Sequence, residues 1–202
     1  MRITDVSKLK GPLGELNNQL FGNNGEEFLV ALNLWLKKVV IKLLKFVTTV
    51  SAPAVSCFVA CEVFGPNNPD GIRFYIWKGF KTNFLDKIEE DIPATSLAVY
   101  TLSQISPDGP IIDELGGSKA ETTLAHLYQL VRGQANGQAG LLLTNGYANV
   151  FYVRDVEGKL RAVSVYWYSI CREWYVRADS VAGPDGWDAG SQVVSQVSSS
   201  EN

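Results

Sequence analysis

The strongest constraint on the fold is an alternation of apolar and polar residues that begins near residue 148. A period of two residues is typical of strands with one buried face. The loop at residues 155–159 contains Gly158 at a position suited to a left-handed turn, so it predicts a hairpin. We therefore expect a C-terminal antiparallel meander with a short final strand, over residues 148–154, 160–169, 172–180 and 192–195.

Aromatic residues gather in this predicted meander, where they suit a pleated and half-buried surface. If Asp155 faces Lys159, the first hairpin places one set of side chains on the core face. This set comprises Phe151, Val153, Val163, Val165 and Trp167. The opposite face combines ring carbon with hydroxyl and guanidinium groups, which is typical of a wet or ligand-binding surface. It comprises Tyr152, Arg154, Ser164, Tyr166 and Tyr168.

The next turn leaves the register of the second predicted hairpin open. Residues 169–171 contain no Gly, Asn or Asp that would specify a tight turn. Trp174 and Tyr175 therefore stay unassigned to either face.

A helix is predicted immediately before the meander, over residues 118–132. Ser118 and Glu121 have the spacing of a capping box, and Gly133 provides a stop. The apolar stripe of this helix is expected to pack on the core face of the meander. His126, the only histidine, falls on the polar side of the helix, which predicts an exposed side chain.

An amphipathic helix is predicted over residues 25–46, after a shorter helix within residues 11–21. Lys38, Lys42 and Lys45 recur on one side of the longer helix. They predict contact with an acidic partner, a membrane surface or a phosphate backbone, or else a solvated face that complements the negative helix end. The partner interpretation makes these three lysines candidate partner-binding residues.

Between these parts the sequence predicts short mixed elements: helices at residues 54–64 and 84–90, and strands at 46–51, 72–77 and 96–102. The predicted fold class is α+β, with N-terminal helices and a capped helix packed on a C-terminal antiparallel β-meander. The predicted organisation is an N-terminal helical region (1–48), an α+β domain (49–195) and a disordered tail (196–202).

Composition limits the setting and the chemistry. A net charge of −3 gives no global attraction to nucleic acid. The first residues contain no apolar run, and the longest uncharged stretch is too short to span a membrane. We therefore predict no secretory signal and no transmembrane segment, and we expect a cytoplasmic location. The odd number of cysteines argues against a disulfide framework. Cys57, Cys61 and Cys171 with His126 are one possible zinc set, but we favour buried small hydrophobes and predict no metal or cofactor.

Three polar motifs have a structural and a functional interpretation. Residues 116–119 (GGSK) invite phosphate binding but lack the frame of a nucleotide P-loop, so a capped helix start is favoured. Residues 89–91 (EED) and the pair Asp185 and Asp188 lack the spacing of a calcium loop. A solvated helix end and a turn-rich loop are favoured instead, with Trp187 at the sheet edge.

Several short strings in the second half of the chain form a recognisable set: residues 81–85 (KTNFL), 113–117 (DELGG), 119–127 (KAETTLAHL), 143–149 (LTNGYAN) and 181–195 around Gly186 and Trp187. Over roughly residues 80–195 the chain resembles an uncharacterised family of hypothetical proteins from candidate-phylum bacteria of the Parcubacteria type. The resemblance implies a bacterial cytoplasmic setting and transfers no catalytic residues. The similar sequences have a Gly/Asp-rich turn where this chain has residues 168–172.

The favoured functional hypothesis is a non-enzymatic binding module for a protein partner. Its candidate ligand-binding residues are Tyr152, Arg154, Tyr166 and Tyr168, because aromatic residues with arginine dominate binding hot spots. One alternative is single-stranded nucleic-acid binding by base stacking, against which the net acidity counts. Another is a small hydrolase in which Cys171 or a serine acts with His126, the only neutral-pH base in the inventory.

Overall fold

The computed structural model describes residues 25–27, 29 and 42–197, and the chain divides into two compact units at residues 41 and 42. In the first unit, residues 25–27 and 29 are helical, within the predicted helix. Lys38, and residues 198–202 of the predicted tail, lie outside the described residues. The second unit contains the sheet and the site considered below.

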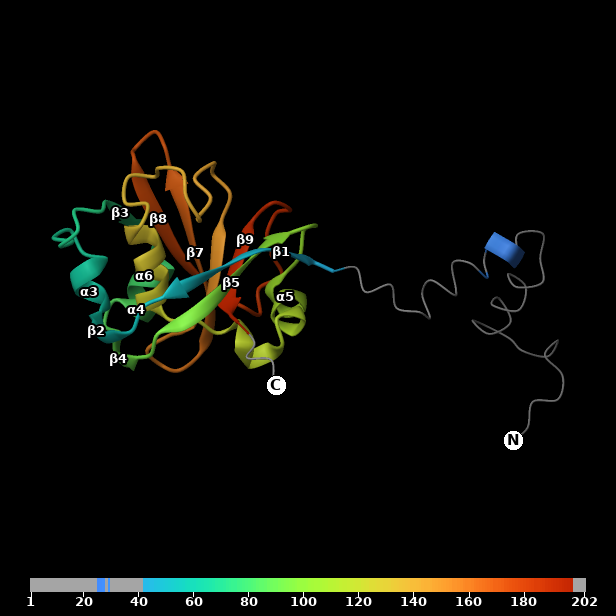
Figure 1. The fold of residues 1–202 in the computed structure, drawn as a ribbon, viewed down its shortest axis with the longest axis horizontal. Helices are drawn as coiled ribbons and strands as arrows, with labels where there is room; N and C mark the ends of the chain where they lie inside the picture. The colour runs from blue at the N-terminus through green and yellow to red at the C-terminus, as the bar shows by residue number, and fades with distance from the viewer. Residues whose placement is uncertain (1–24, 28, 30–41, 198–202) are drawn as a thin grey trace. The chain divides into compact units, whose positions relative to one another are not determined.

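A seven-stranded sheet forms the centre of the second unit (Figure 1). All neighbouring strands are antiparallel except two parallel pairs, β6 with β9 and β3 with β8. The mixed α and β class and the antiparallel β6–β7–β8 meander are confirmed. In sheet order the strands are β1 (Leu44–Ala52), β5 (Thr95–Leu102), β9 (Gln192–Gln196), β6 (Asn149–Arg154), β7 (Leu160–Tyr168), β8 (Glu173–Ser180) and β3 (Phe74–Ile76).

Two further strands, β2 (Val55–Val59) and β4 (Ile88–Ile92), pair antiparallel in a separate small sheet. They continue β1 and β5 beyond a bend, since Ala52 pairs with Thr95 and Val55 pairs with Ile92. Pro53 and Pro93 lie at this bend. A proline cannot donate to a strand ladder, so the hairpin leaves the main sheet there.

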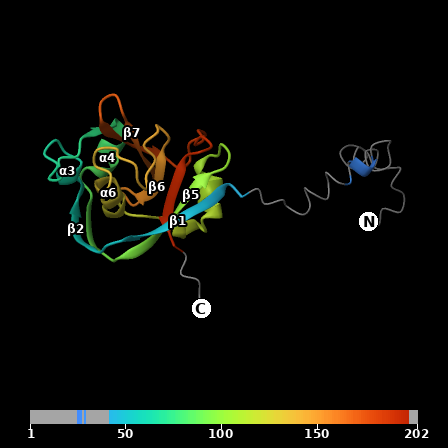
Figure 2. The same ribbon diagram turned by 45° about the horizontal axis from the view of Figure 1, so that its top comes forward.

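One face of the main sheet is covered by α4 (Lys78–Phe84) and α6 (Leu124–Arg132), while α5 (Asp108–Glu114) lies on the other side (Figures 1 and 2). The first face holds the larger hydrophobic cluster, to which a short helix, α3 (Ala60–Val63), contributes Ala60. Gly79 lets α4 approach β8 closely, because a Cβ there would lie 2.4 Å from the backbone oxygen of Ala178. The predicted core face is confirmed: Phe151, Val153, Val163, Val165 and Trp167 are all buried in this cluster.

The opposite face is covered at one end only. There α5 and a 3₁₀ helix (Gly117–Ala120) place Ile111, Leu115 and Ala120 against Val150 and other residues of a second hydrophobic cluster. This cluster draws no side chain from β8 or β3. The β7–β8–β3 end of the face therefore carries exposed side chains, which form the candidate site.

The start of α6 differs from the prediction. Ser118 lies in the 3₁₀ helix, and α6 begins at Leu124 with Thr123 as its N-cap, whose hydroxyl accepts a hydrogen bond from the amide of His126 at 3.1 Å. The β2–β4 pair packs against this helix, so His126 is only 2% exposed. Its predicted exposure is wrong because another element covers the side of the helix that the sequence marks as polar.

Other elements agree in part. Strands β3 and β5 confirm the predictions at residues 72–77 and 96–102. The helix predicted at residues 54–64 is instead β2 followed by the single turn of α3. The helix predicted at residues 84–90 is also wrong, because α4 ends at Phe84 and β4 begins at Ile88. The end of the predicted helix at 25–46 is also wrong, because β1 starts at Leu44 and crosses the boundary predicted after residue 48. No helix in the described part of the chain has the length and hydrophobicity to cross a bilayer.

Candidate functional site

Five aromatic residues and one arginine form a continuous patch on the uncovered end of the sheet. Alternation along β8 buries Trp174, Val176 and Ala178 and turns the intervening side chains to the opposite face. Strand pairing places Tyr175 directly beside Tyr166 of β7 and Tyr75 of β3. We call this patch the aromatic surface: Tyr75, Trp77, Tyr166, Tyr168, Tyr175 and Arg177.

The tyrosine rings of the aromatic surface pack on one another. Tyr175 is stacked on Tyr75 with ring centroids 4.7 Å apart and 28° between the ring planes. Its ring lies 5.2 Å from that of Tyr166 and 5.0 Å from that of Tyr168. These distances are those of aromatic pairs in direct contact. The array is therefore packed before any ligand arrives, and the central ring of Tyr175 is in contact with three neighbouring rings.

Trp77 and Arg177 continue the patch at the junction of β3 and α4. The amide of Trp77 donates to the backbone oxygen of Val176 at 3.0 Å, which fixes the junction to β8. The guanidinium of Arg177 lies 5.2 Å from the centre of the Trp77 ring, within the range of a cation–π contact. A carboxylate oxygen of Asp179 lies 3.3 Å from the same guanidinium. Arg177 is thus held between a ring and a carboxylate.

The hydroxyl groups of Tyr166 and Tyr175 stay protonated at neutral pH. Loss of hydration raises the pKa of Tyr166 and that of Tyr175. For Tyr175, neighbouring negative charges raise the pKa further. A protonated phenol both donates and accepts hydrogen bonds. The aromatic surface therefore offers polar tips on an apolar body without adding negative charge.

A groove adjoins the aromatic surface at Tyr166 and Arg177. It consists of two cavities of about 560 and 360 Å³ that share Arg177, Gly186 and Trp187. Two backbone hydrogen bonds join Trp187 to Ser106, and the indole N–H of Trp187 donates to Asp108 at 2.7 Å. These bonds fix the Trp187 ring as a rigid wall of the groove.

Tyr152 is not part of the exposed site, so its predicted role as a ligand-binding residue is corrected. Its side chain has no exposed area, because α5 and the 3₁₀ helix cover this part of the face. Its hydroxyl donates to Asp108 at 2.9 Å. Burial, with the adjacent carboxylate, raises the pKa of Tyr152, so this hydroxyl remains a donor within the core.

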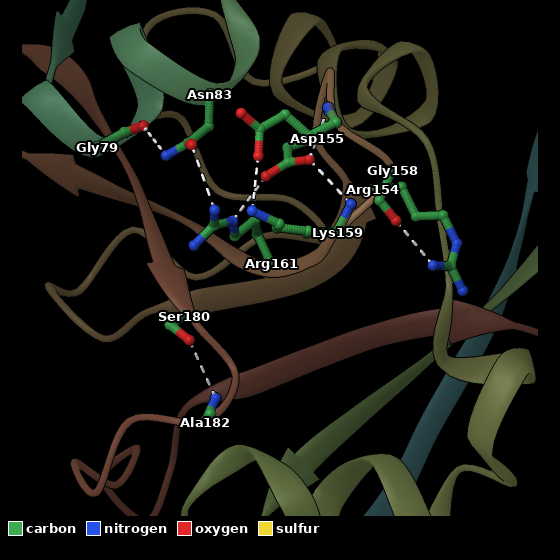
Figure 3. Close-up of polar contacts among 10 residues, drawn as sticks. Gly79, Asn83, Arg154, Asp155, Gly158, Lys159, Arg161, Ser180 and Ala182 are labelled. Carbon is green, nitrogen blue, oxygen red and sulfur yellow. Dashed lines mark hydrogen bonds and ion pairs between the residues drawn. The ribbon is translucent and has the colours of Figure 1, made fainter.

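Arg154 is exposed, but its guanidinium is already engaged. It forms an ion pair with Glu121, and its Nη1 donates to the backbone oxygen of Gly158 at 2.9 Å (Figure 3). The hydrogen bond and charge of Glu121 raise the pKa of Arg154. Arg154 closes the β6–β7 loop. The other two candidates, Tyr166 and Tyr168, belong to the aromatic surface.

The adjacent loop is held by Asp155, whose carboxylate accepts bonds of 2.9 Å from the amides of Glu157 and Lys159 and 2.8 Å from Arg161 Nε (Figure 3). Burial alone would raise the pKa of Asp155, but these hydrogen bonds outweigh it and lower the pKa. The amide of Val156 also donates to the backbone oxygen of Asn83 at 3.1 Å, which ties the loop to α4. We assign these contacts to the stability of the hairpin.

The candidate lysines do not share one helical face. Lys45 is exposed on strand β1, and Lys42 is exposed just before that strand. Because β1 replaces the end of the predicted helix, the stripe is broken between residues 41 and 45. The structure therefore gives no support to a basic patch formed by Lys42 and Lys45 on a helix.

Cys57, Cys61 and Cys171 are exposed, so their predicted burial is wrong. Within residues 42–197 and the described helical residues, no three His, Cys, Asp or Glu side chains gather in a way that would hold a metal ion. Neither ring nitrogen of His126 has a hydrogen-bond partner among the described residues. The nucleophile–histidine pair that the hydrolase hypothesis needs is accordingly missing from this part of the chain.

Sequence reasoning missed Tyr75, Trp77, Tyr175 and Arg177. The alternation in residues 72–77 was a usable signal for Tyr75 and Trp77, since both fall on one side of a strand. The parallel pairing of β3 with β8 joins residues about a hundred positions apart and has no local signal.

Comparisons with family models, curated proteins and solved structures find no match to this chain. The resemblance to the candidate-phylum family therefore stays a prediction, and the function is argued from the site alone.

Proposed function

We propose that this protein is a non-enzymatic binding module that binds a protein partner through the aromatic surface. The observation that carries the proposal is the mutually packed row of tyrosines on β7, β8 and β3, in which Tyr75 and Tyr168 are exposed and Tyr166 and Tyr175 are half-buried. Tyr, Trp and Arg are the residues most enriched at binding hot spots. We also propose that the protein acts in the cytoplasm, as expected from its sequence.

The packing of the rings supports a protein partner for energetic reasons. Binding costs conformational entropy when side chains must be ordered. Tyrosine has few rotatable bonds, and rings that already contact one another lose less freedom when a partner arrives. Tyr75 and Trp77 remain 49% and 43% exposed, so apolar area is still available for burial.

The same geometry favours a protein over single-stranded nucleic acid. Base stacking needs an open ring face. Tyr75 is stacked on Tyr175, Tyr166 and Tyr168 contact the same ring at a tilt, and Arg177 lies over the ring of Trp77. We therefore keep nucleic acid only as an outcome of the test, and we do not propose hydrolysis because His126 is buried.

The test is selection from a displayed library of random peptides, followed by affinity measurements with the selected peptides. The double variant Tyr75→Ala/Tyr175→Ala is expected to weaken binding at least about tenfold, since truncation of hot-spot residues typically costs over 1 kcal/mol. The control is Phe46→Ala, an aromatic residue that is 58% exposed on β1, at the far edge of the sheet.

Peptides that bind the parent and the double variant equally would overturn the proposal, as would a library that yields no binder. A uridine 12-mer is tested in parallel. Retention of this oligonucleotide, lost in the double variant, would replace the protein partner by single-stranded nucleic acid.

A further inference from the structure

The groove beside the aromatic surface carries an excess of negative charge. Its two cavities are lined by four aspartates, Asp108, Asp179, Asp185 and Asp188, and by one arginine, Arg177, for a formal charge of −3. Arg177 is already paired with Asp179. Asp185 and Asp188 are exposed on the rim. The unpaired charge of the groove is therefore negative.

Three aromatic side chains contribute to the walls of the larger cavity. Tyr147 and Tyr166 line it together with Trp187, and Asp188 lies in the same lining. A cation above an aromatic ring is attracted by the negative ring face, and a nearby carboxylate adds to this attraction. Aromatic walls with carboxylates at the rim thus complement a basic side chain.

The protein itself contains an example of this arrangement. The guanidinium of Arg177 lies over Trp77 and beside Asp179, 5.2 Å from the ring centre and 3.3 Å from the carboxylate oxygen. The groove repeats these components, with Trp187 as the ring and Asp185 and Asp188 as the carboxylates. Among the described residues that line the groove, Arg177 is the only basic one.

Asp108 lies at the buried end of the groove. Burial raises the pKa of Asp108, and the hydrogen bonds that it accepts from Trp187 and Tyr152 act in the opposite direction; the carboxylate of Asp179 makes a smaller contribution that raises the pKa. The position of Trp187 is fixed by these bonds, so the groove is preformed.

We infer that this groove binds an arginine or lysine side chain from a basic segment of the protein partner. The inference rests on the proposed function, because the groove shares Tyr166 and Arg177 with the aromatic surface. The partner segment would lie across the tyrosines and place its basic residue between Trp187 and the rim aspartates.

The test uses the full chain and a fluorescent hexa-arginine peptide, with hexaglutamate as the oppositely charged probe, measured by anisotropy at 50 mM NaCl. Asp185→Asn/Asp188→Asn is expected to weaken hexa-arginine binding at least about threefold, as two exposed ion pairs would. Tyr147→Ala removes an aromatic wall without changing charge, and it is expected to weaken binding as well. Both effects should shrink at 300 mM NaCl.

The matched control is Glu62→Gln/Glu90→Gln, which removes the same charge from exposed positions on α3 and β4. An equal loss in this control would mean general attraction to an acidic protein and would overturn the inference. So would unchanged binding by Asp185→Asn/Asp188→Asn, or hexaglutamate binding as tightly as hexa-arginine.

The two proposals fail separately. If the selected peptides need Tyr75 and Tyr175 for binding but bind Asp185→Asn/Asp188→Asn as tightly as the parent, the proposed function stands. The inference that the groove binds a basic side chain is then wrong. If hexa-arginine binding needs the two aspartates but the selected peptides bind equally well without the tyrosines, the groove still binds basic side chains. The proposal that the aromatic surface binds the partner is then wrong.

Discussion

At the scale of single residues, His126 has surroundings that do not match its chemistry. Buried polar atoms in proteins are usually hydrogen-bonded. Both ring nitrogens of His126 are buried without a partner among the described residues, and the side chain sits in the first turn of α6. Desolvation lowers the pKa of His126 below the ordinary value of 6.5 and outweighs the effect of the Pro93 backbone, which acts in the opposite direction, so the folded protein holds the neutral imidazole at neutral pH.

This burial predicts a loss of stability in mild acid. As pH falls through 6.5, the unfolded chain binds more proton at His126 than the folded chain does, so the free energy of unfolding falls as pH falls toward the lowered folded pKa. The slope contributed by one proton is at most about 1.4 kcal/mol per pH unit. Urea unfolding at pH 7 and pH 5 measures it.

The comparison variant is His126→Leu, which removes the titrating group without breaking a side-chain hydrogen bond in the described structure. The variant should lose less stability than the parent between pH 7 and pH 5. The same loss in both proteins would show that His126 does not contribute to the acid sensitivity.

At the scale of elements, helix α6 has a strand residue as a second capping group, in addition to its N-cap Thr123. The carboxylate of Glu89 in β4 accepts hydrogen bonds from the amides of Leu124 at 3.1 Å and Ala125 at 2.9 Å. These amides belong to the first turn, where no intrahelical acceptor exists. A carboxylate there is also favoured by the helix dipole. The bend at Pro53 and Pro93 thus carries the β2–β4 pair to the end of the helix.

We predict that Glu89→Ala destabilises the protein by about 1–3 kcal/mol, because it leaves two buried amides without acceptors. The measurement is the midpoint of urea unfolding. Glu90→Ala is the matched control, since the neighbouring carboxylate is exposed on the other side of the same strand. Equal effects of the two substitutions would contradict a capping role for Glu89.

The elements that the sequence predicts well are those specified by neighbouring residues. The register of the β6–β7 hairpin follows from Asp155 and Lys159, and the amide of Asp155 donates to the oxygen of Lys159 at 2.9 Å as expected. The capping box at Ser118 and Glu121 is locally plausible, but the acceptor that starts α6 comes from a strand 35 residues away. Alternation also placed Tyr152 on the correct side of β6, yet it gave no sign that α5 would cover it.

At the scale of the whole molecule, one sheet contributes side chains to two hydrophobic clusters, one on each of its faces. The larger cluster lies under α4 and α6, and the smaller one lies under α5 and the 3₁₀ helix. Among the described residues, the buried members of both clusters fall within residues 44–194. The second compact unit therefore contains the apolar burial of both clusters in the described part of the chain.

We accordingly predict that residues 42–202, expressed alone, fold cooperatively. The fragment keeps the amides of Leu43 and Leu44 that donate to Glu114 at 2.7 and 3.1 Å. The expected result is a single thermal transition within a few degrees of the full chain, with the same near-ultraviolet circular dichroism. A fragment without a cooperative transition would contradict the assignment of both clusters to this unit.

The packing of Tyr175 against three other rings also has an evolutionary consequence. A substitution at Tyr175 changes the support of every neighbouring ring, so natural selection acts on the tyrosines jointly. Among related sequences, the residues aligned with Tyr75, Tyr166 and Tyr175 should covary, either kept together as aromatics or replaced together. Partner specificity would then change in abrupt steps between lineages, because single substitutions spoil the surface before they can redirect it.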